Sequence, residues 1–220
     1  MLSLRNLYLF ISFPFAFAVP IIAQSDNSTH FHWSIRKAHE LPYNATVARS
    51  TELSSSEKSA LIRVIEAEIR PYMDDQDIPT EKAFHRLVRN TRIKLVDLNQ
   101  DGIPEILAQA IDIREGCGAT GNCTFWVFQK QNDTYRKLLD TRGKDGIGGI
   151  ELITVEPNRT HGFLDFTLAA HDSAAEKDLY FYRFNGVRYT QTACYIASWI
   201  DDKDPTKGRR QTPAIFPCVH

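Results

Sequence analysis

The sequence lacks an excess of charge of either sign. Its 26 lysine and arginine residues and 27 aspartate and glutamate residues give a formal net charge of −1, and the chain has no long basic or acidic block. Binding to nucleic acid or to anionic membranes requires a concentration of positive charge. We therefore expect neither nucleic acid nor a membrane surface as a partner.

Cysteine is scarce, and no two cysteines have the Cys-x-x-Cys spacing that is typical of structural zinc sites. The four that occur are Cys117, Cys123, Cys194 and Cys218. An even number of cysteines in an exported chain favours disulfide bonds, and three pairings are possible. We favour Cys117–Cys123 and Cys194–Cys218, because two glycines in "CGATGNC" allow so short a loop to close.

The sequence also lacks a recognisable catalytic set. It has no Gly-x-Ser-x-Gly motif, and the adjacent residues 171–173, "HDS", are sequence neighbours that cannot converge as a catalytic triad does. His30, His32 and His39 could together bind a transition metal. Their place in an irregular segment near the mature N-terminus favours an exposed tail instead. Whether the protein is an enzyme stays open, and a non-enzyme is favoured.

One long apolar run is present, at the N-terminus. Residues 1–23 contain a single early cation, Arg5, then an apolar stretch and small residues before a cleavage point at Ala23 or Ala18. This pattern is typical of a secretory signal peptide. A membrane anchor is the disfavoured alternative, because two prolines interrupt the run. We expect an exported protein, periplasmic or extracellular, with no membrane span after signal cleavage.

About 197 residues then remain, enough for one domain with a substantial core. Residues 24–52 are polar and irregular. Ser54 and Glu57 stand at capping-box spacing before apolar residues that repeat at helical spacing, which predicts an amphipathic helix. A second, short helix is a weaker prediction for "TEKAFHRLV". Residues 53–220 are predicted to form a single domain.

The chain from Arg92 onward is rich in β-branched and aromatic residues. They occur in eight short runs, separated by glycine, asparagine and aspartate. The connections are too short for crossover helices, so we expect antiparallel strands. The predicted fold class is mainly β, a β-rich α+β fold with an N-terminal amphipathic helix.

Two stretches within this β-rich region resemble each other. "GIPEILAQAID" at 102–112 matches "GFLDFTLAAHD" at 162–172 in its glycine, acidic and apolar positions. Three aromatic residues further on recur with identical spacing, namely Trp126, Phe128 and Tyr135 in the first stretch and Tyr180, Tyr182 and Tyr189 in the second. We expect two related β-units, at about 92–140 and 150–195, with the short disulfide loop inserted in the first.

The most patterned segment is "DLNQDGIPE", which places oxygen-bearing side chains at alternate positions. Ca²⁺ binds about six to eight oxygen ligands, and a glycine after the third such side chain permits the tight turn that encloses the ion. We therefore predict one structural Ca²⁺. The predicted ligands are the side chains of Asp97, Asn99, Asp101 and Glu105 and the backbone carbonyl of Ile103.

The spacing Asp-x-Asn-x-Asp-Gly-x-x-Glu between two strands resembles the calcium loops of FG-GAP and VCBS repeats, the integrin-α-like β-propeller units. The resemblance covers roughly residues 92–135 and implies a calcium-binding β-unit. An EF-hand is excluded, because Ala108 stands where that motif needs a bidentate glutamate. The longer string "DLNQDGIPEI…CGATGNCTFWVF" also resembles exported bacterial proteins of unknown function, which implies no activity.

A metal-free turn is the alternative for this loop, with Asp97 and Asn99 capping their own backbone. In the second β-unit the corresponding positions hold Pro157, Arg159 and His161, so that only one metal site is predicted.

Five Asn-x-Ser/Thr triplets occur, where chance predicts about one. They begin at Asn27, Asn44, Asn122, Asn132 and Asn158. In a eukaryotic host they predict exposed glycosylation sites, whereas in a bacterium they would ordinarily stay unmodified.

These features predict an exported, disulfide-stabilised calcium-binding module without catalysis of its own. Its expected partner is an extracellular or periplasmic protein or carbohydrate. The alternative is a secreted hydrolase or hydrolase inhibitor whose working surface is the Cys117–Cys123 loop, since stapled loops on β scaffolds commonly carry recognition.

Overall fold

The fold is known from a computed structural model that describes most of the chain after the predicted signal peptide. The described residues are 31–42, 44–72, 80–111, 117, 120–141, 148–200 and 208–218. The predicted signal peptide, residues 1–23, and the predicted histidine ligand His30 lie outside them.

Two α-helices precede the strands. They are α1 (Ser55–Ile69), extended by the 3₁₀ turn η1 (Arg70–Tyr72), and α2 (Glu81–Asn90), so both predicted helices are confirmed. The predicted capping box starts α1: the Ser54 hydroxyl accepts a bond from the Glu57 backbone N–H, and the Glu57 carboxylate accepts one from the Ser54 N–H. None of the helices in the described residues is long and apolar enough to cross a membrane.

Glu57 should make the fold sensitive to acid. The hydrogen-bonded ion pair with Lys130, aided by the bonds from Ser54, lowers the pKa of Glu57 from 4.5 to about 2. Because the pKa is lower in the folded state, this stabilisation is complete above about pH 4.5 and is lost as the pH falls toward 2. Solvent screening of the partly exposed pair limits its size to about 1 kcal/mol.

The variant Glu57→Gln tests this effect, because glutamine retains the cap but removes the charge. Urea unfolding should show it about 1 kcal/mol less stable than the wild type at neutral pH. The difference should disappear near pH 2. An equal difference at both pH values would show that the carboxylate charge is not its cause.

The strands of the described residues form two antiparallel sheets, of four and five strands, which confirms the mainly β prediction. The first sheet consists of β1 (Arg92–Val96), β2 (Glu105–Gln109), β3 (Phe125–Gln131) and β4 (Thr134–Asp140). The second consists of β5 (Leu152–Thr160), β6 (Phe163–Ser173), β7 (Glu176–Phe184), β8 (Tyr189–Ser198) and β9 (Ala214–Pro217). All eight predicted runs are strands, and only β9 was not predicted.

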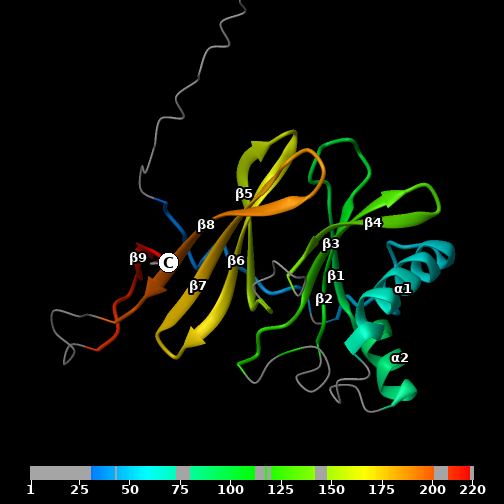
Figure 1. Ribbon diagram of the computed structural model, residues 1–220, viewed down its shortest axis with the longest axis horizontal. Coiled ribbons are helices and arrows are strands. Elements are labelled where there is room, and N and C mark those ends of the chain that lie inside the picture. The colour runs from blue at the N-terminus through cyan, green and yellow to red at the C-terminus, as the bar shows by residue number, and fades with distance from the viewer. Residues whose placement is uncertain are drawn as a thin grey trace, which may run out of the picture. The chain divides into compact units, whose positions relative to one another are not determined.

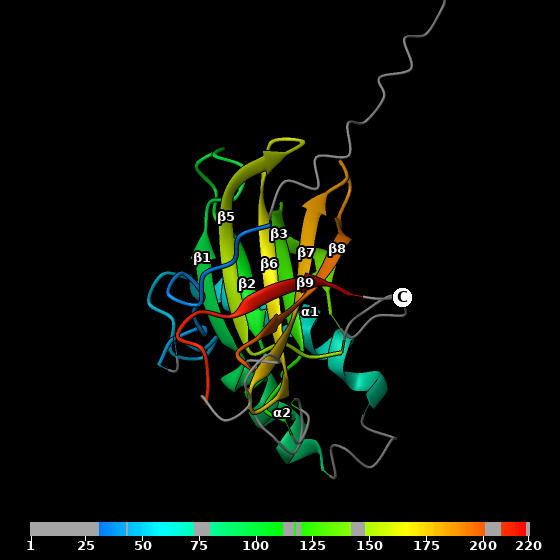
Figure 2. The same ribbon diagram turned by 90° about the vertical axis from the view of Figure 1, so that its left-hand side faces the viewer.

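The helices cover one face of the four-stranded sheet, and the five-stranded sheet covers the other (Figures 1 and 2). Strand β3 explains this layering through its alternating side chains. Trp126 and Phe128 pack with the helices, whereas Phe125 and Val127 point into the second core, which also contains Phe166 of the five-stranded sheet. Because both faces of β3 are covered, its first four residues are all buried.

The two predicted β-units have equivalent strand order and register. Ile106 of β2 pairs with Phe128 of β3, and the corresponding Phe166 of β6 pairs with Tyr182 of β7. The next hairpin in each unit has a register shift at the matching place, directly before Phe128 and directly before Tyr182. The units differ mainly between their second and third strands, where the first carries the disulfide loop and the second has a tight turn.

The segment before α1 is irregular, as predicted, but the prediction of an exposed tail is wrong for its described part. Trp33 is only 3% exposed. His39 pairs with Ile153 at the edge of β5, and Thr46 pairs with Arg92 at the edge of β1. The segment thus covers edge strands whose backbone groups would otherwise lack partners.

Candidate metal centre

The predicted metal loop joins β1 to β2. Its backbone curls tightly, because Gln100 (φ 62°) and Gly102 (φ 85°) both adopt the left-handed region. Glycine reaches this region without the steric cost that a Cβ atom adds, which explains the glycine at this position.

The loop's side chains hydrogen-bond to its own backbone. Asp97 Oδ2 accepts from the Gly102 N–H at 3.1 Å, Asn99 Oδ1 from the Asp101 N–H at 3.0 Å, and Asp101 Oδ1 from the Ile103 N–H at 2.7 Å. The Asn99 amide also donates to Asp101 Oδ2 at 2.8 Å. The backbone bonds accepted by Asn99 and Asp101 are Asx turns of the kind that the metal-free alternative expects, whereas the bond accepted by Asp97 spans five residues. Together these contacts preorganise the loop whether or not an ion binds.

Asp97 differs from the other side chains of the loop. Its second oxygen, Oδ1, is buried and has no hydrogen-bond partner among the described residues. Burying a carboxylate oxygen without a partner costs free energy unless a cation or water compensates it. The internal hydrogen bonds of the loop therefore leave Asp97 Oδ1 without a partner.

Glu105 is buried to 1% exposure at the start of β2. Burial raises its pKa, and the nearby Asp101 charge adds to the rise. The Leu98 N–H and the Gln129 amide oppose it, donating to Oε2 at 2.9 Å and to Oε1 at 3.1 Å. These bonds fix Glu105 beneath the loop.

The carboxylates of the loop are not gathered into a closed cluster. Within the described part of the chain, no group of three or more His, Cys, Asp or Glu side chains could hold a metal ion. The predicted ligand set also includes an amide oxygen and a backbone carbonyl, which Ca²⁺ accepts readily. The donor types therefore fit calcium. The acidic side chains of the described loop do not, however, form a closed coordination shell.

The loop is anchored to the second β-unit through Leu98. This side chain is fully buried in the core between the sheets. Its carbonyl accepts bonds from the Leu164 N–H at 2.9 Å and from the Arg159 guanidinium at 2.7 Å, and Arg159 also donates to the Gly162 carbonyl. Arg159 stands where the first unit has Asn99, a predicted ligand, and its bond to the Leu98 carbonyl holds the β1–β2 loop against the second unit.

The second unit closes its first hairpin without an ion-binding sequence. His161 (φ 49°) and Gly162 (φ 85°) form a two-residue turn between the paired Thr160 and Phe163, the geometry of a type I′ hairpin. Asp165, the counterpart of Glu105, is buried and its pKa is raised by that burial.

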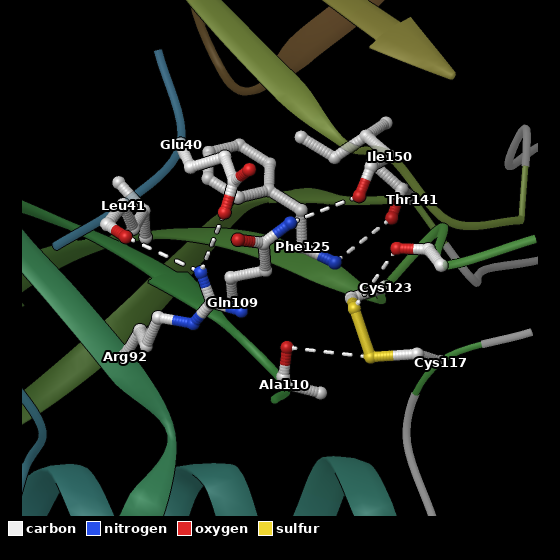
Figure 3. The surroundings of a disulfide bond; sticks show 11 residues. Glu40, Leu41, Arg92, Gln109, Ala110, Cys117, Cys123, Phe125, Thr141 and Ile150 are labelled. Atoms are coloured by element: carbon white, nitrogen blue, oxygen red, sulfur yellow. Dashed lines mark hydrogen bonds and ion pairs between the residues drawn. A yellow bond between two sulfur atoms is a disulfide. The ribbon is translucent and has the colours of Figure 1, made fainter. Parts of the chain in front are cut away.

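Both favoured disulfides are present, and they indicate an oxidising compartment. The Cys117–Cys123 bridge closes the inserted loop (Figure 3). Cys123 also exchanges backbone hydrogen bonds with Ile150. The Cys194–Cys218 bridge joins β8 to the residue after β9. The disulfides therefore support an oxidising compartment. Export itself, and the choice between the periplasm and the cell exterior, stay predictions.

Asn122, predicted as an exposed glycosylation site, is only partly exposed, and its side chain hydrogen-bonds to the backbone of β6. Its side-chain oxygen accepts from the His171 N–H at 2.7 Å, and its amide donates to the His171 carbonyl at 2.8 Å. The triplets at Asn44, Asn132 and Asn158 do begin with exposed residues, whereas Asn27 lies outside the described residues.

Residues 171–173 form the end of β6, where the pairing with β7 shifts register between His171 and Ser173.

Comparison with protein-family models, with curated proteins and with solved structures finds no match for this chain. The resemblance to FG-GAP and VCBS repeats therefore depends on the residues of the β1–β2 loop alone.

Proposed function

We propose that this protein is an exported, disulfide-stabilised binding module whose β1–β2 loop holds one structural Ca²⁺. The buried, unpartnered Oδ1 of Asp97 carries this proposal, because a cation would satisfy it. The proposed ligands are Asp97, Asn99, Asp101, the Ile103 carbonyl and Glu105.

Calcium would supply positive charge to a loop that holds three carboxylates and little compensating charge of its own. Asp97 and Asp101 already cap the loop's backbone, so little ordering is needed before an ion binds. Because Leu98 ties the loop to the core between the sheets, stabilising the loop stabilises the contact between the two β-units. The ion's role in this proposal is structural.

Calcium should raise the melting temperature of the secreted protein relative to chelator. At free calcium one hundred times Kd, linkage predicts about 2.7 kcal/mol of added stability. Asp101→Ala should abolish the shift. Asp172→Ala, which removes an exposed carboxylate on β6, is the matched control and should retain it. The proposal fails if the wild type shows no shift, or if Asp101→Ala shows the same shift.

The alternative, a hydrolase or hydrolase inhibitor, depends on the Cys117–Cys123 loop. Residues 112–116 and 118–119 of this loop and its approach lie outside the described residues. The alternative therefore stays a prediction from the sequence.

A further inference from the structure

A pocket of about 500 Å³ lies between the N-terminal half of α1 and the β3–β4 hairpin. Figure 1 shows α1 running beside this hairpin. The volume falls within the range of small-molecule sites. Hydroxyl groups are abundant on its walls, contributed by three serines of the helix start and by the hairpin's threonine and tyrosine. The pocket shares no residue with the candidate metal loop.

Tyr135 is the most informative residue of this pocket. It is only 7% exposed and belongs to the core under the helices, yet no described residue gives its hydroxyl a hydrogen bond. Burial, together with the Glu57 charge, raises the pKa of Tyr135 to about 12, so the hydroxyl stays protonated. Its counterpart in the second β-unit, Tyr189, donates to the Leu164 carbonyl. The hydroxyl of Tyr135 makes no hydrogen bond to a described residue and is not among the fully buried unpartnered atoms, so it is accessible to a ligand in the pocket.

The charges around the pocket are balanced. Glu57 and Lys130 form an ion pair at 2.7 Å, with 28% and 40% of their side chains exposed. Arg63 and Asp133 add one further charge of each sign to the lining. The positive end of α1 is already occupied by the capping carboxylate of Glu57. An anion would therefore gain little here, whereas a neutral ligand with many donors and acceptors would find partners of both kinds.

We propose that this pocket binds a neutral sugar. The Tyr135 hydroxyl donates to a sugar oxygen, the carboxylates of Glu57 and Asp133 accept from sugar hydroxyls, and Lys130 and Arg63 donate to others. Sugar hydroxyls both donate and accept, which matches this mixed lining. The proposal deepens the binding role proposed above by naming carbohydrate as the ligand class, but it does not depend on calcium.

Nuclear magnetic resonance of the ¹⁵N-labelled secreted protein tests this site directly. The probes are glucose, galactose, mannose and N-acetylglucosamine, with inorganic phosphate as the charged comparison. At least one sugar should cause saturable shifts confined to residues 54–63 and 130–135, and phosphate should cause none there. Tyr135→Phe keeps the ring packing but removes the donor, and should weaken that sugar roughly fivefold or more.

Two control variants show whether a loss of sugar affinity comes from the pocket itself. Tyr180→Phe removes a hydroxyl that bonds to Asp178 on β7, outside the pocket, and should leave the affinity unchanged. Asp101→Ala should also leave it unchanged, so that failure of the calcium proposal would not affect this result. If Tyr135→Phe does not fold, Arg63→Gln at the exposed rim replaces it and should also weaken binding.

The proposal is overturned if no sugar shifts these resonances at tens of millimolar. It is equally overturned if the folded pocket variant binds as tightly as the wild type, or if phosphate binds there more tightly than every sugar.

Discussion

Replacing Leu98 with alanine should lower the free energy of unfolding by about 2–5 kcal/mol. Leu98 lies inside the candidate metal loop, between two predicted ligands, yet its side chain is fully buried between the sheets. The substitution removes methyl groups from that core and leaves a cavity beneath the loop. It also weakens the packing that positions the Leu98 carbonyl for its bonds from Leu164 and Arg159.

Ile103→Ala is the matched control for this prediction, because Ile103 belongs to the same loop and is 53% exposed. Its effect should stay within about 0.5 kcal/mol. Both variants are compared with the wild type by urea unfolding in the presence of chelator, which isolates packing from any effect of calcium. Equal and small effects of the two substitutions would show that the loop is not anchored through Leu98.

Removing the Cys194–Cys218 bridge should have the second large effect. The cysteines are separated by 24 positions, and the loop-entropy model predicts a loss of about 3–4 kcal/mol for the double variant Cys194→Ser, Cys218→Ser. The bridge holds the end of β9, which pairs with β8 alone through four residues. Without it, β9 should detach from the edge of the sheet.

The double variant of Cys117 and Cys123 is the internal comparison. Its cysteines are six positions apart, so the same model predicts a smaller loss of about 2–2.5 kcal/mol. Denaturant unfolding under non-reducing conditions measures both losses. A larger loss for the shorter ring would contradict the entropic account of these bridges.

The helices and the first eight strands could be predicted because their signals are local. The capping box at Ser54 and the run of aromatic and β-branched residues along β3 each lie within a few residues. Strand β9 could not be predicted in this way. It is short and ends in Pro217, and it is a strand because β8 and the Cys194–Cys218 bridge hold it in place.

The candidate ligands of the metal loop could likewise be identified from spacing, but the support beneath them could not. Arg159 reaches the Leu98 carbonyl across 61 positions of sequence, and Asn122 binds the backbone of His171 across 49. From the sequence alone, Arg159 is interpreted only as the replacement of a predicted ligand, and Asn122 only as the start of a glycosylation triplet. The unpartnered hydroxyl of Tyr135 was hidden for the same reason, because the packing of a helix against a hairpin creates its pocket.

Calorimetric titration of the protein, produced without its predicted signal peptide, with Ca²⁺ tests the central claim most directly. The account predicts one ion per chain, and a roughly tenfold or greater loss of affinity for Asp97→Asn, which removes the charge but keeps the shape of the side chain. The exposed control Asp172→Asn should titrate like the wild type. No heat of binding for the wild type, or an unchanged titration for Asp97→Asn, would contradict the account.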